Sequence, residues 1–264
     1  MTSATAVRHR SYARRQSTDT PSDLPLLNMP STLSDVFAAA GLEPAGIVRW
    51  GTPVPETAQG VYVVALADST TSADAALPTA PLSRSALQHL LAVRPDLKLD
   101  LATADIDGLA ERLGSFWTAD EVILYIGLAG QPLRTRVRQY YRTPLGARKP
   151  HAGGWWLKTL SVLDELWVHY APTPDFRDAE KRMLRAFADA MSSSSRSCLR
   201  DRERVMPFAN LRGFDNAIKL HGITGATGNI PSRSAENELA KDLAQPSEPV
   251  STTPLPTERR RLSR

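Results

Sequence analysis

Residues 122–142 read VILYIGLAGQPLRTRVRQYYR. The apolar first half is typical of a short strand, and Gly127 and Gly130 mark the turn that ends it. The arginine-rich second half predicts a helix in which Arg136 and Tyr140, four positions apart, share one face. A strand that brings a tyrosine to a glycine turn, followed at once by a cationic helix, is an arrangement expected around a phosphate-bearing ligand.

The positive charge of the chain is concentrated rather than large. The 264 residues carry a net charge of only +4, with 42% hydrophobic residues, which suits one globular domain with polar ends or two small domains. Residues 131–163 contain no acidic residue, and their cations are Arg134, Arg136, Arg138, Arg142, Arg148, Lys149 and Lys158. Such a block attracts phosphates. A basic face that is merely solvated has the same composition, so charge alone leaves both interpretations open.

The composition also indicates where in the cell the protein is expected. Cys198 is the single cysteine, which excludes an intrachain disulfide and a thiolate zinc site and is typical of a reducing cytoplasm. The basic start of the chain lacks the apolar segment of a secretory signal, and no apolar run approaches the length of a membrane span. We therefore expect a cytoplasmic protein with no membrane partner, and the oligomeric state stays open.

The pattern of apolar residues divides the chain into three regions. Residues 1–30 are rich in Arg, Ser and Thr and predict a disordered basic arm, and residues 229–264 predict a disordered tail rich in Pro, Ser and charge. Residues 31–228 alternate strands with helices, which predicts one α/β (α+β) domain with a small central β-sheet of about three strands flanked by helices. The strands are expected near residues 60–66, 121–127 and 165–171.

The helix predicted after Thr173 carries an acid in an unusual place. Its apolar face includes Met183, Leu184 and Phe187, and Glu180 lies on or at the edge of that face. A carboxylate there is costly unless it is paired or bound to a metal. Taken singly, each feature has an ordinary explanation, because strand tyrosines are usually core and helix arginines usually face solvent. The order of the features along the chain is what argues for a function.

In this order the features resemble the GIY-YIG nuclease family. The motifs that carry the resemblance are, in chain order, GVY (60–62), YIG (125–127), LRTRVRQYY (133–141), HAGGWWLKTL (151–160), EKRML (180–184) and PFANL (207–211). The resemblance covers about residues 58–225. It implies a metal-dependent endonuclease that hydrolyses phosphodiester bonds in DNA, double-stranded or branched. The catalytic residues that it implies are Tyr62, Tyr125, Arg136, Tyr140, Glu180, Asn210 and His151.

The residue types at these positions suit that reaction. Glu180 is implied to be the metal ligand, and a hydrated Mg²⁺ (or Mn²⁺) often takes only one or two carboxylates. Arg136 suits a phosphate oxygen, because its guanidinium is a planar fork of donors. Near Arg136, the ionised form of Tyr62 is expected to be favoured, so that Tyr62 acts as the general base.

The other implied site residues have supporting roles. Tyr125 is expected to orient water or phosphate, and Tyr140 to hydrogen-bond the scissile phosphate. Asn210 is expected to brace Glu180 or the metal-bound waters, and Gly127 to let the backbone approach the substrate. His151 has two interpretations, a second base or phosphate donor and an ordinary loop histidine. The flanking nucleic-acid backbone is expected to be held by Arg134, Arg138, Arg142, Arg148 and Lys149.

The chain departs from the family at one point. The family joins its two motif strands by a short hairpin, whereas residues 63–124 separate Tyr62 from Tyr125 here. Residues 68–117 predict a helical insertion packed outside the sheet, which serves as a lid, a specificity element or a partner surface. A surface insertion is tolerable because the entropy cost of closing a loop grows slowly with its length.

Two further residue types have competing interpretations. Trp155 and Trp156 are suited to stack on a base, yet the helical pattern places at least one of them in the core. His169 lies within a predicted strand and is expected to be structural.

The sequence is also compatible with two alternatives to a nuclease. One is a non-catalytic nucleic-acid-binding module on the same scaffold. The other is a domain whose insertion binds a protein and whose basic block is only solvated. The residues at the motif positions are chemically competent, which favours the nuclease.

Overall fold

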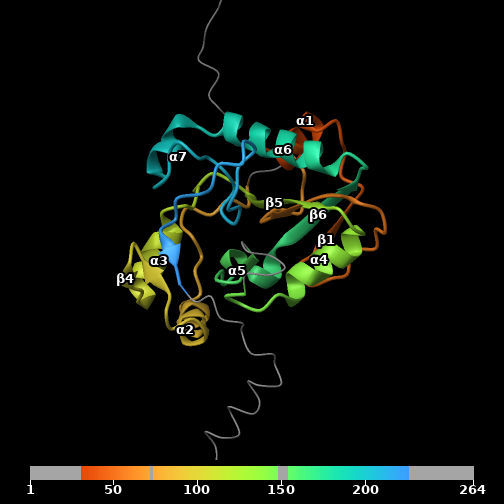
Figure 1. Cartoon of the computed structure of the whole chain (residues 1–264). Helices are drawn as coiled ribbons and strands as arrows, with labels where there is room; N and C mark the ends of the chain where they lie inside the picture. Colours follow the sequence, from red (N-terminus) through yellow and green to blue (C-terminus); the bar gives the residue numbers. More distant parts are fainter. Residues whose placement is uncertain (1–30, 72–73, 148–153, 226–264) are drawn as a thin grey trace, which may run out of the picture.

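The computed structural model describes residues 31–71, 74–147 and 154–225. They form a mixed α+β fold with two small antiparallel sheets and surrounding helices (Figure 1). None of the described helices is both long and apolar enough to cross a membrane. The predicted arm and tail lie outside the described residues, and so do three predicted site residues, Arg148, Lys149 and His151.

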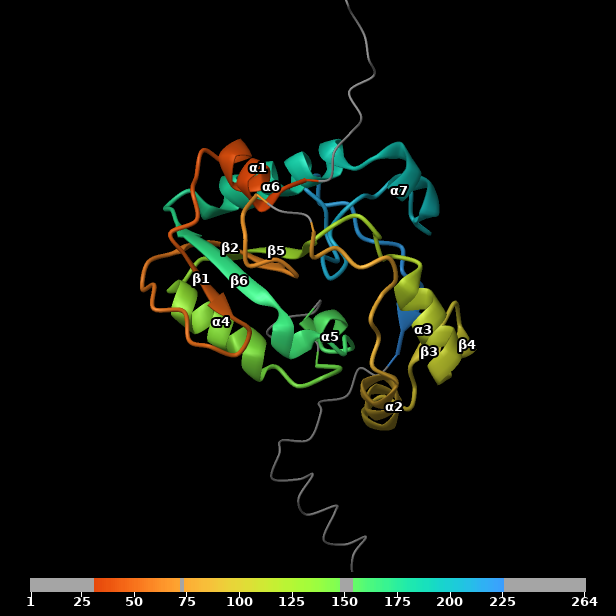
Figure 2. The same ribbon diagram turned by 180° about the vertical axis from the view of Figure 1, so that it is seen from behind.

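The larger sheet has four strands in the order β1-β6-β2-β5, with every neighbouring pair antiparallel. The strands are β1 Gly46–Arg49, β2 Gly60–Ala65, β5 Ile123–Ala129 and β6 Trp167–Pro172. The prediction of about three strands falls one short, because it misses β1 at the edge of the sheet (Figure 2). Strand β1 has four residues, none of them fully buried, so it carries little of the apolar signal that marks the other three.

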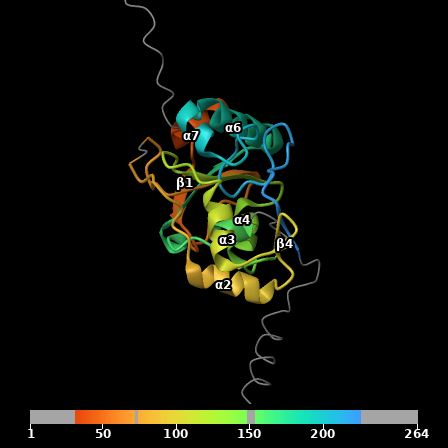
Figure 3. The same cartoon turned by 90° about the vertical axis from the view of Figure 1, so that its left-hand side faces the viewer.

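Helices cover both faces of this sheet (Figure 3). Helices α1 (Leu33–Ala39) and α6 (Phe176–Ala190) lie on one face. Helix α4 (Leu133–Arg142) lies on the other, and its first two amides donate to backbone carbonyls of Ala58 and Glu56 just before β2. The remaining helices are α2 (Arg84–Val93), α3 (Ile106–Gly114), α5 (Gly154–Leu157), α7 (Ser193–Cys198) and a 3₁₀ turn at Leu163–Glu165.

Strand β2 is the centre of both layers. Val61 and Val63 pack in the cluster of the α6 face, whereas Tyr62 and Val64 pack in the cluster of the α4 face. This alternation follows from the two-residue period of a strand. All six residues of β2 are buried, so the strand reads as a continuous apolar run in the sequence.

The two motif strands pair directly despite the long interval between them. In the antiparallel register of β2 and β5, Tyr62 lies opposite Gly127 and Gly60 lies opposite Ala129. Gly60 is required by close packing, since a Cβ there would lie 2.9 Å from Leu133 Cδ1 and would collide with the Ala171 carbonyl oxygen. The glycine therefore lets α4 approach the sheet closely at the start of β2.

The interval between β2 and β5 is helical, as predicted, and its helices contribute to the hydrophobic core. Apolar side chains of α2 and α3 join the hydrophobic cluster of the α4 face. The Phe116 ring centroid lies 5.6 Å from that of Trp156, which lies 5.3 Å from that of Phe208. A second, three-stranded sheet ties the interval to the end of the domain, and its strands are β3 Lys98–Leu99, β4 Ala102–Thr103 and β7 Ile223–Thr224. Helices α2 and α3 are thus part of the domain core.

The open edge of β5 is closed by a side chain. Asn210 Oδ1 accepts from the Ile126 amide at 2.9 Å, and Asn210 Nδ2 donates to the Ile126 carbonyl at 2.8 Å. The neighbouring Ala209 amide donates to the Leu124 carbonyl at 2.8 Å. Because Asn210 is only 5% exposed, its amide replaces the backbone partner that the edge strand lacks.

We predict that Asn210→Ala lowers the free energy of unfolding by about 2–4 kcal/mol, because it leaves two buried backbone groups of Ile126 without a partner. Urea denaturation measures the loss. A matched control is Gln59→Ala, which removes an exposed amide that donates to the Gly130 carbonyl and should cost less than about 1 kcal/mol. Equal losses in the two variants would show that Asn210 does not hold the strand.

Candidate functional site

Three tyrosines from separate elements meet on the α4 face of the sheet. Tyr62 comes from β2, Tyr125 from β5 and Tyr140 from α4. Their ring centroids lie 5.8 Å apart for Tyr62 and Tyr125, 6.3 Å for Tyr62 and Tyr140, and 5.1 Å for Tyr125 and Tyr140. Trp50, which follows β1, packs edge-on against Tyr140 at 5.3 Å. Residues predicted from distant motifs are therefore in mutual contact.

Arg136 supplies the positive charge of this cluster. It is half-buried on α4, one turn before Tyr140. Its charge lowers the pKa of each of the three tyrosines, although their burial raises the pKa more. It also lowers the pKa of the Glu180 carboxyl, against a larger effect of burial. Arg136 is thus electrostatically coupled to groups from β2, β5, α4 and α6.

The tyrosines differ in exposure. Tyr62 and Tyr140 are completely buried, whereas Tyr125 is partly exposed. The accessible part of the cluster therefore consists of Tyr125, Arg136 and Glu180, all of them half-buried. Tyr62 and Tyr140 lie buried behind these three residues. The sequence did not predict this burial.

The expected ionisation of Tyr62 is not found in this structure. Burial, followed by the neighbouring phenols of Tyr125 and Tyr140, holds the pKa of Tyr62 well above its ordinary value of 10.0. Burial likewise raises the pKa of Tyr125, and Glu180 raises it further. The contact between the Tyr62 and Tyr125 hydroxyls falls short of standard hydrogen-bond geometry, yet it raises the pKa of Tyr62 and lowers that of Tyr125. Of these two phenols, Tyr125 is the one whose ionised form this contact supports.

Gly127 has a different role from the one predicted. A Cβ at this position would lie 3.0 Å from both Cζ and the hydroxyl oxygen of Tyr125. The ring of Tyr125 lies over the Gly127 backbone, so the space that the missing side chain creates is filled by Tyr125. The glycine positions the tyrosine and does not leave room for a phosphate.

Glu180 lies beside the outer edge of β5. It is half-buried on α6, and burial raises the pKa of its carboxyl from 4.5 to about 7. Arg136 and the Leu128 backbone amide both oppose this rise. The sequence-based expectation of a carboxylate at the border of an apolar helix face is confirmed.

Asn210 acts on the strand rather than on Glu180. Both polar atoms of its side chain bond the backbone of Ile126, the residue after Tyr125. It therefore supports Tyr125 by fixing β5, whereas the sequence assigned it to Glu180 or to metal-bound water.

The exposed arginines of α4 lie in one row. Arg134, Arg138 and Arg142 are spaced by four residues and are all exposed. They are accompanied by a hollow of about 430 Å³, lined by Thr135, Arg138, Gln139, Arg142, Thr143 and Pro144. This arginine row has the exposure expected of side chains that hold a phosphate backbone. The other two predicted contacts, Arg148 and Lys149, lie outside the described residues.

Two residues that support the site were not predicted. Trp50 covers Tyr140 and also packs against Tyr141 at 4.8 Å, but it lies in a part of the sequence without a motif. Lys158 Nζ donates to the Tyr141 carbonyl at 2.9 Å and to the Thr143 carbonyl, which satisfies the end of α4. Burial lowers the pKa of Lys158 to about 8.

The predicted structural roles of two aromatic residues are confirmed. His169 is buried in β6, and its Nε2 lies 2.9 Å from the Ala67 carbonyl oxygen. Trp156 is fully buried, as expected for at least one of the tryptophan pair.

No protein-family model, curated protein or solved structure matches this chain. Within residues 31–71, 74–147 and 154–225, no group of three or more His, Cys, Asp or Glu residues is arranged to hold a metal ion.

We predict that Glu180 makes the stability of the metal-free protein depend on pH. Its folded-state pKa of about 7 exceeds the ordinary value of 4.5, so the folded protein retains a proton that the unfolded chain releases. The contribution is fully present below pH 4.5 and is lost as the pH rises through about 7. Relative to Glu180→Gln, wild-type stability should fall over this range, and the variant should be the more stable at pH 8.

Urea denaturation of both proteins from pH 4 to pH 8 in a chelator provides the test. Groups that the two proteins share cancel in the difference. A difference that does not change with pH would mean that Glu180 is not desolvated by the fold.

Proposed function

We propose that this protein is a metal-dependent endonuclease that hydrolyses phosphodiester bonds in DNA through a GIY-YIG-type active site and fold. The observation that carries the proposal is the coupling of Arg136 to Tyr62, Tyr125, Tyr140 and Glu180, which come from four different elements. The direct pairing of the two motif strands adds to it. If the motif residues had only unrelated structural roles, they would not be expected to gather in one place.

Glu180 fits the role of a single protein ligand for Mg²⁺ or Mn²⁺. Its carboxyl is half-buried and its ionised form is disfavoured, so a divalent cation would stabilise the charge that burial penalises. A hard cation of this kind keeps several waters and needs few carboxylates, which suits a site without an acidic cluster. When bound, the ion would lower the pKa of a coordinated water and offset negative charge on the phosphate.

The accessible residues have complementary tasks. The guanidinium of Arg136 binds a non-bridging phosphate oxygen and stabilises the charge that develops in the transition state. The hydroxyl of the partly exposed Tyr125 orients the attacking water, with Tyr62 behind it as the hydroxyl partner. Tyr140 supports Arg136 and Tyr125 from the buried side.

The exposed row Arg134, Arg138 and Arg142 binds the flanking DNA backbone. The row lies on α4, the helix that also carries Arg136, so it adds positive charge within a few turns of the accessible cluster. Contacts of these arginines with phosphates give affinity without sequence preference.

A non-catalytic nucleic-acid-binding module is the second candidate. One observation favours it, namely that Tyr62 and Tyr140 are completely buried and so do not touch a substrate in this arrangement. Metal-dependent cleavage of DNA distinguishes the two candidates, because the binding module has none.

We predict that Mg²⁺ stabilises the protein through Glu180. At pH 8 the melting temperature of the wild type should rise by about 5–10 °C when the ion is about 100-fold above its Kd. Glu180→Gln should abolish this rise. Glu121→Gln is a matched control, because Glu121 is also a buried carboxyl, with a pKa that burial raises to about 8. A Mg²⁺ response that survives in Glu180→Gln, or that is lost in the control, would remove Glu180 as the ligand.

We predict that two arginines of α4 have separate effects on cleavage. Arg136→Ala should reduce the single-turnover rate at saturating DNA by at least about 100-fold, because the transition-state charge loses its donor. Arg138→Ala should keep this rate, weaken DNA binding and reduce the slope of log affinity against log salt by about 1. Quenched-flow cleavage and binding titrations at several salt concentrations separate these effects. Equal losses of rate in both variants would contradict the assignment.

A further inference from the structure

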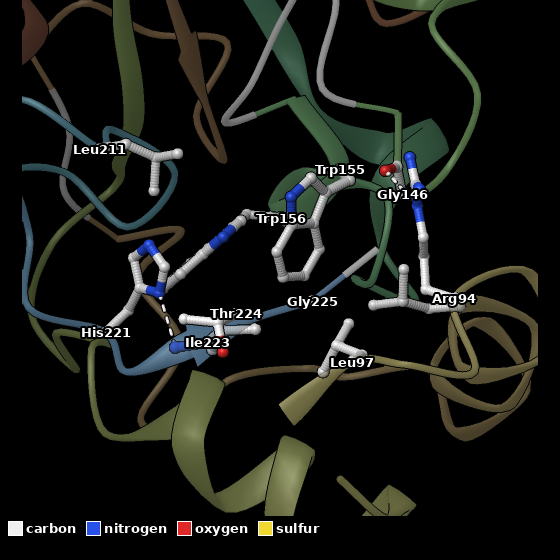
Figure 4. Close-up of a pocket in the computed structure, with 11 residues that line it drawn as sticks. Arg94, Leu97, Gly146, Trp155, Trp156, Leu211, His221, Ile223, Thr224 and Gly225 are labelled. Atoms are coloured by element: carbon white, nitrogen blue, oxygen red, sulfur yellow. Dashed lines mark hydrogen bonds between the residues drawn. The ribbon is translucent and has the colours of Figure 1, made fainter. Parts of the chain in front are cut away.

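A cavity of about 300 Å³ lies between α5 and the small sheet that contains β3 and β7 (Figure 4). Its walls come from five separate parts of the chain. The insertion contributes Leu90, Arg94 and Leu97. The other described lining residues are Gly146, Trp155, Trp156, Leu211, His221, Ile223, Thr224 and Gly225. The residues of the accessible cluster do not line it, so it is a distinct feature of the molecule.

One wall of the cavity is a fixed aromatic platform. Trp156 is fully buried and is held by Phe116, by Phe208 and by Lys219, whose Nζ lies 4.8 Å from its ring centroid. Trp155 is half-buried, and its ring centroid lies 5.7 Å from that of Trp156. The pair thus combines a fixed inner indole with an outer indole that solvent reaches.

The cavity has few polar groups, and the only charge among its described lining residues is positive. Arg94 is 7% exposed, and its Nε donates to the Gly146 carbonyl at 3.0 Å. His221 Nδ1 accepts from the Ile223 amide at 2.9 Å, and burial together with Lys219 and Arg112 lowers the pKa of His221 to about 4. His221 is therefore neutral near pH 7. Among the described lining residues, the cavity carries one guanidinium and no carboxylate.

We propose that this cavity binds one unpaired nucleobase of the nucleic-acid substrate. A volume of about 300 Å³ is at the small end of ligand sites and accommodates a planar ring rather than a helix. Indole faces and a planar guanidinium are the groups on which unstacked bases pack.

The position of the cavity connects it with the nucleic-acid surface. Gly146, Trp155 and Trp156 belong to residues 131–163, the acid-free segment that also contains the arginine row. A strand attracted by this segment is thereby placed near the cavity. The inference rests on the proposed function, since it assigns a substrate feature to the same protein, namely DNA with an extrahelical or single-stranded base.

The insertion forms part of the proposed base-binding cavity. Arg94 and Leu97 form one wall, and a Cβ on Gly146 would lie 3.0 Å from Leu90 Cδ1, so the insertion packs tightly against the loop after α4. One wall of the cavity is therefore supplied by α2 and the residues that follow it. We assign the insertion as an element that selects DNA structure.

The test uses the full chain without divalent metal, so that cleavage does not occur. The probe is a duplex with a single bulged 2-aminopurine, compared with the same duplex fully paired. The wild type should change the 2-aminopurine emission and bind the bulged duplex about tenfold more tightly. Trp155→Ala should lose both effects and keep its affinity for the paired duplex. The control Trp167→Ala, which removes a half-buried indole of β6 away from the cavity, should keep both.

A second variant keeps the test decisive in case Trp155→Ala does not fold. Thr224→Phe places a ring at an exposed lining position of β7 and should block the base without removing a contact. The inference is overturned if the wild type binds bulged and paired duplexes alike, or if both cavity variants respond as the wild type does. Trp155-dependent quenching of protein fluorescence by adenosine 5′-monophosphate, without any response to the bulged duplex, would overturn the assignment to a DNA strand.

These outcomes are independent of the proposed activity. Emission changes that depend on Trp155 in a protein that never cleaves DNA would keep the cavity assignment and reject the nuclease. Metal-dependent cleavage without a preference for the bulged duplex would keep the nuclease and reject the cavity assignment.

Discussion

The candidate site depends on the antiparallel register of β2 on β5. With Tyr62 opposite Gly127, the phenols of Tyr62 and Tyr125 both point to the α4 face. A slip of one residue would turn every side chain of β5 to the other face and remove Tyr125 from the cluster. Asn210 holds Ile126 from the open edge, so the register is secured by a side chain as well as by the neighbouring strand.

Two opposing effects act on the groups held by this register. Burial favours their neutral forms, and Arg136 favours their ionised forms. Burial has the larger effect at all four groups, so the phenols are neutral and Glu180 titrates near neutral pH. A site with one half-buried arginine and one carboxyl whose ionised form is disfavoured is suited to receive a second cation and an anionic ligand together, because each then compensates the charge of the other.

Two features outside this cluster differ in kind, because one is a row of charged side chains and the other is a cavity. In the proposed function, the arginine row supplies charge for a phosphate backbone, whereas the cavity beside Trp155 supplies a space of the size of a single ring. Both belong to the acid-free segment 131–163 or border it. The insertion lines the cavity and leaves the pairing of the motif strands undisturbed, so the cavity and the candidate site are structurally separate.

The sequence by itself determined the three longer strands of the sheet, α4, α6, the helical content of residues 68–117 and the motif positions. These properties are visible because apolar periodicity is local and survives in a single chain. Only the tertiary structure decided that Tyr62 and Tyr140 are buried, that Asn210 bonds β5, that β1 and Trp50 complete the layer, and that the insertion joins the core. Burial, and the pKa shifts that follow from it, depend on neighbours that arrive from distant parts of the chain, and no local period records which neighbours these are.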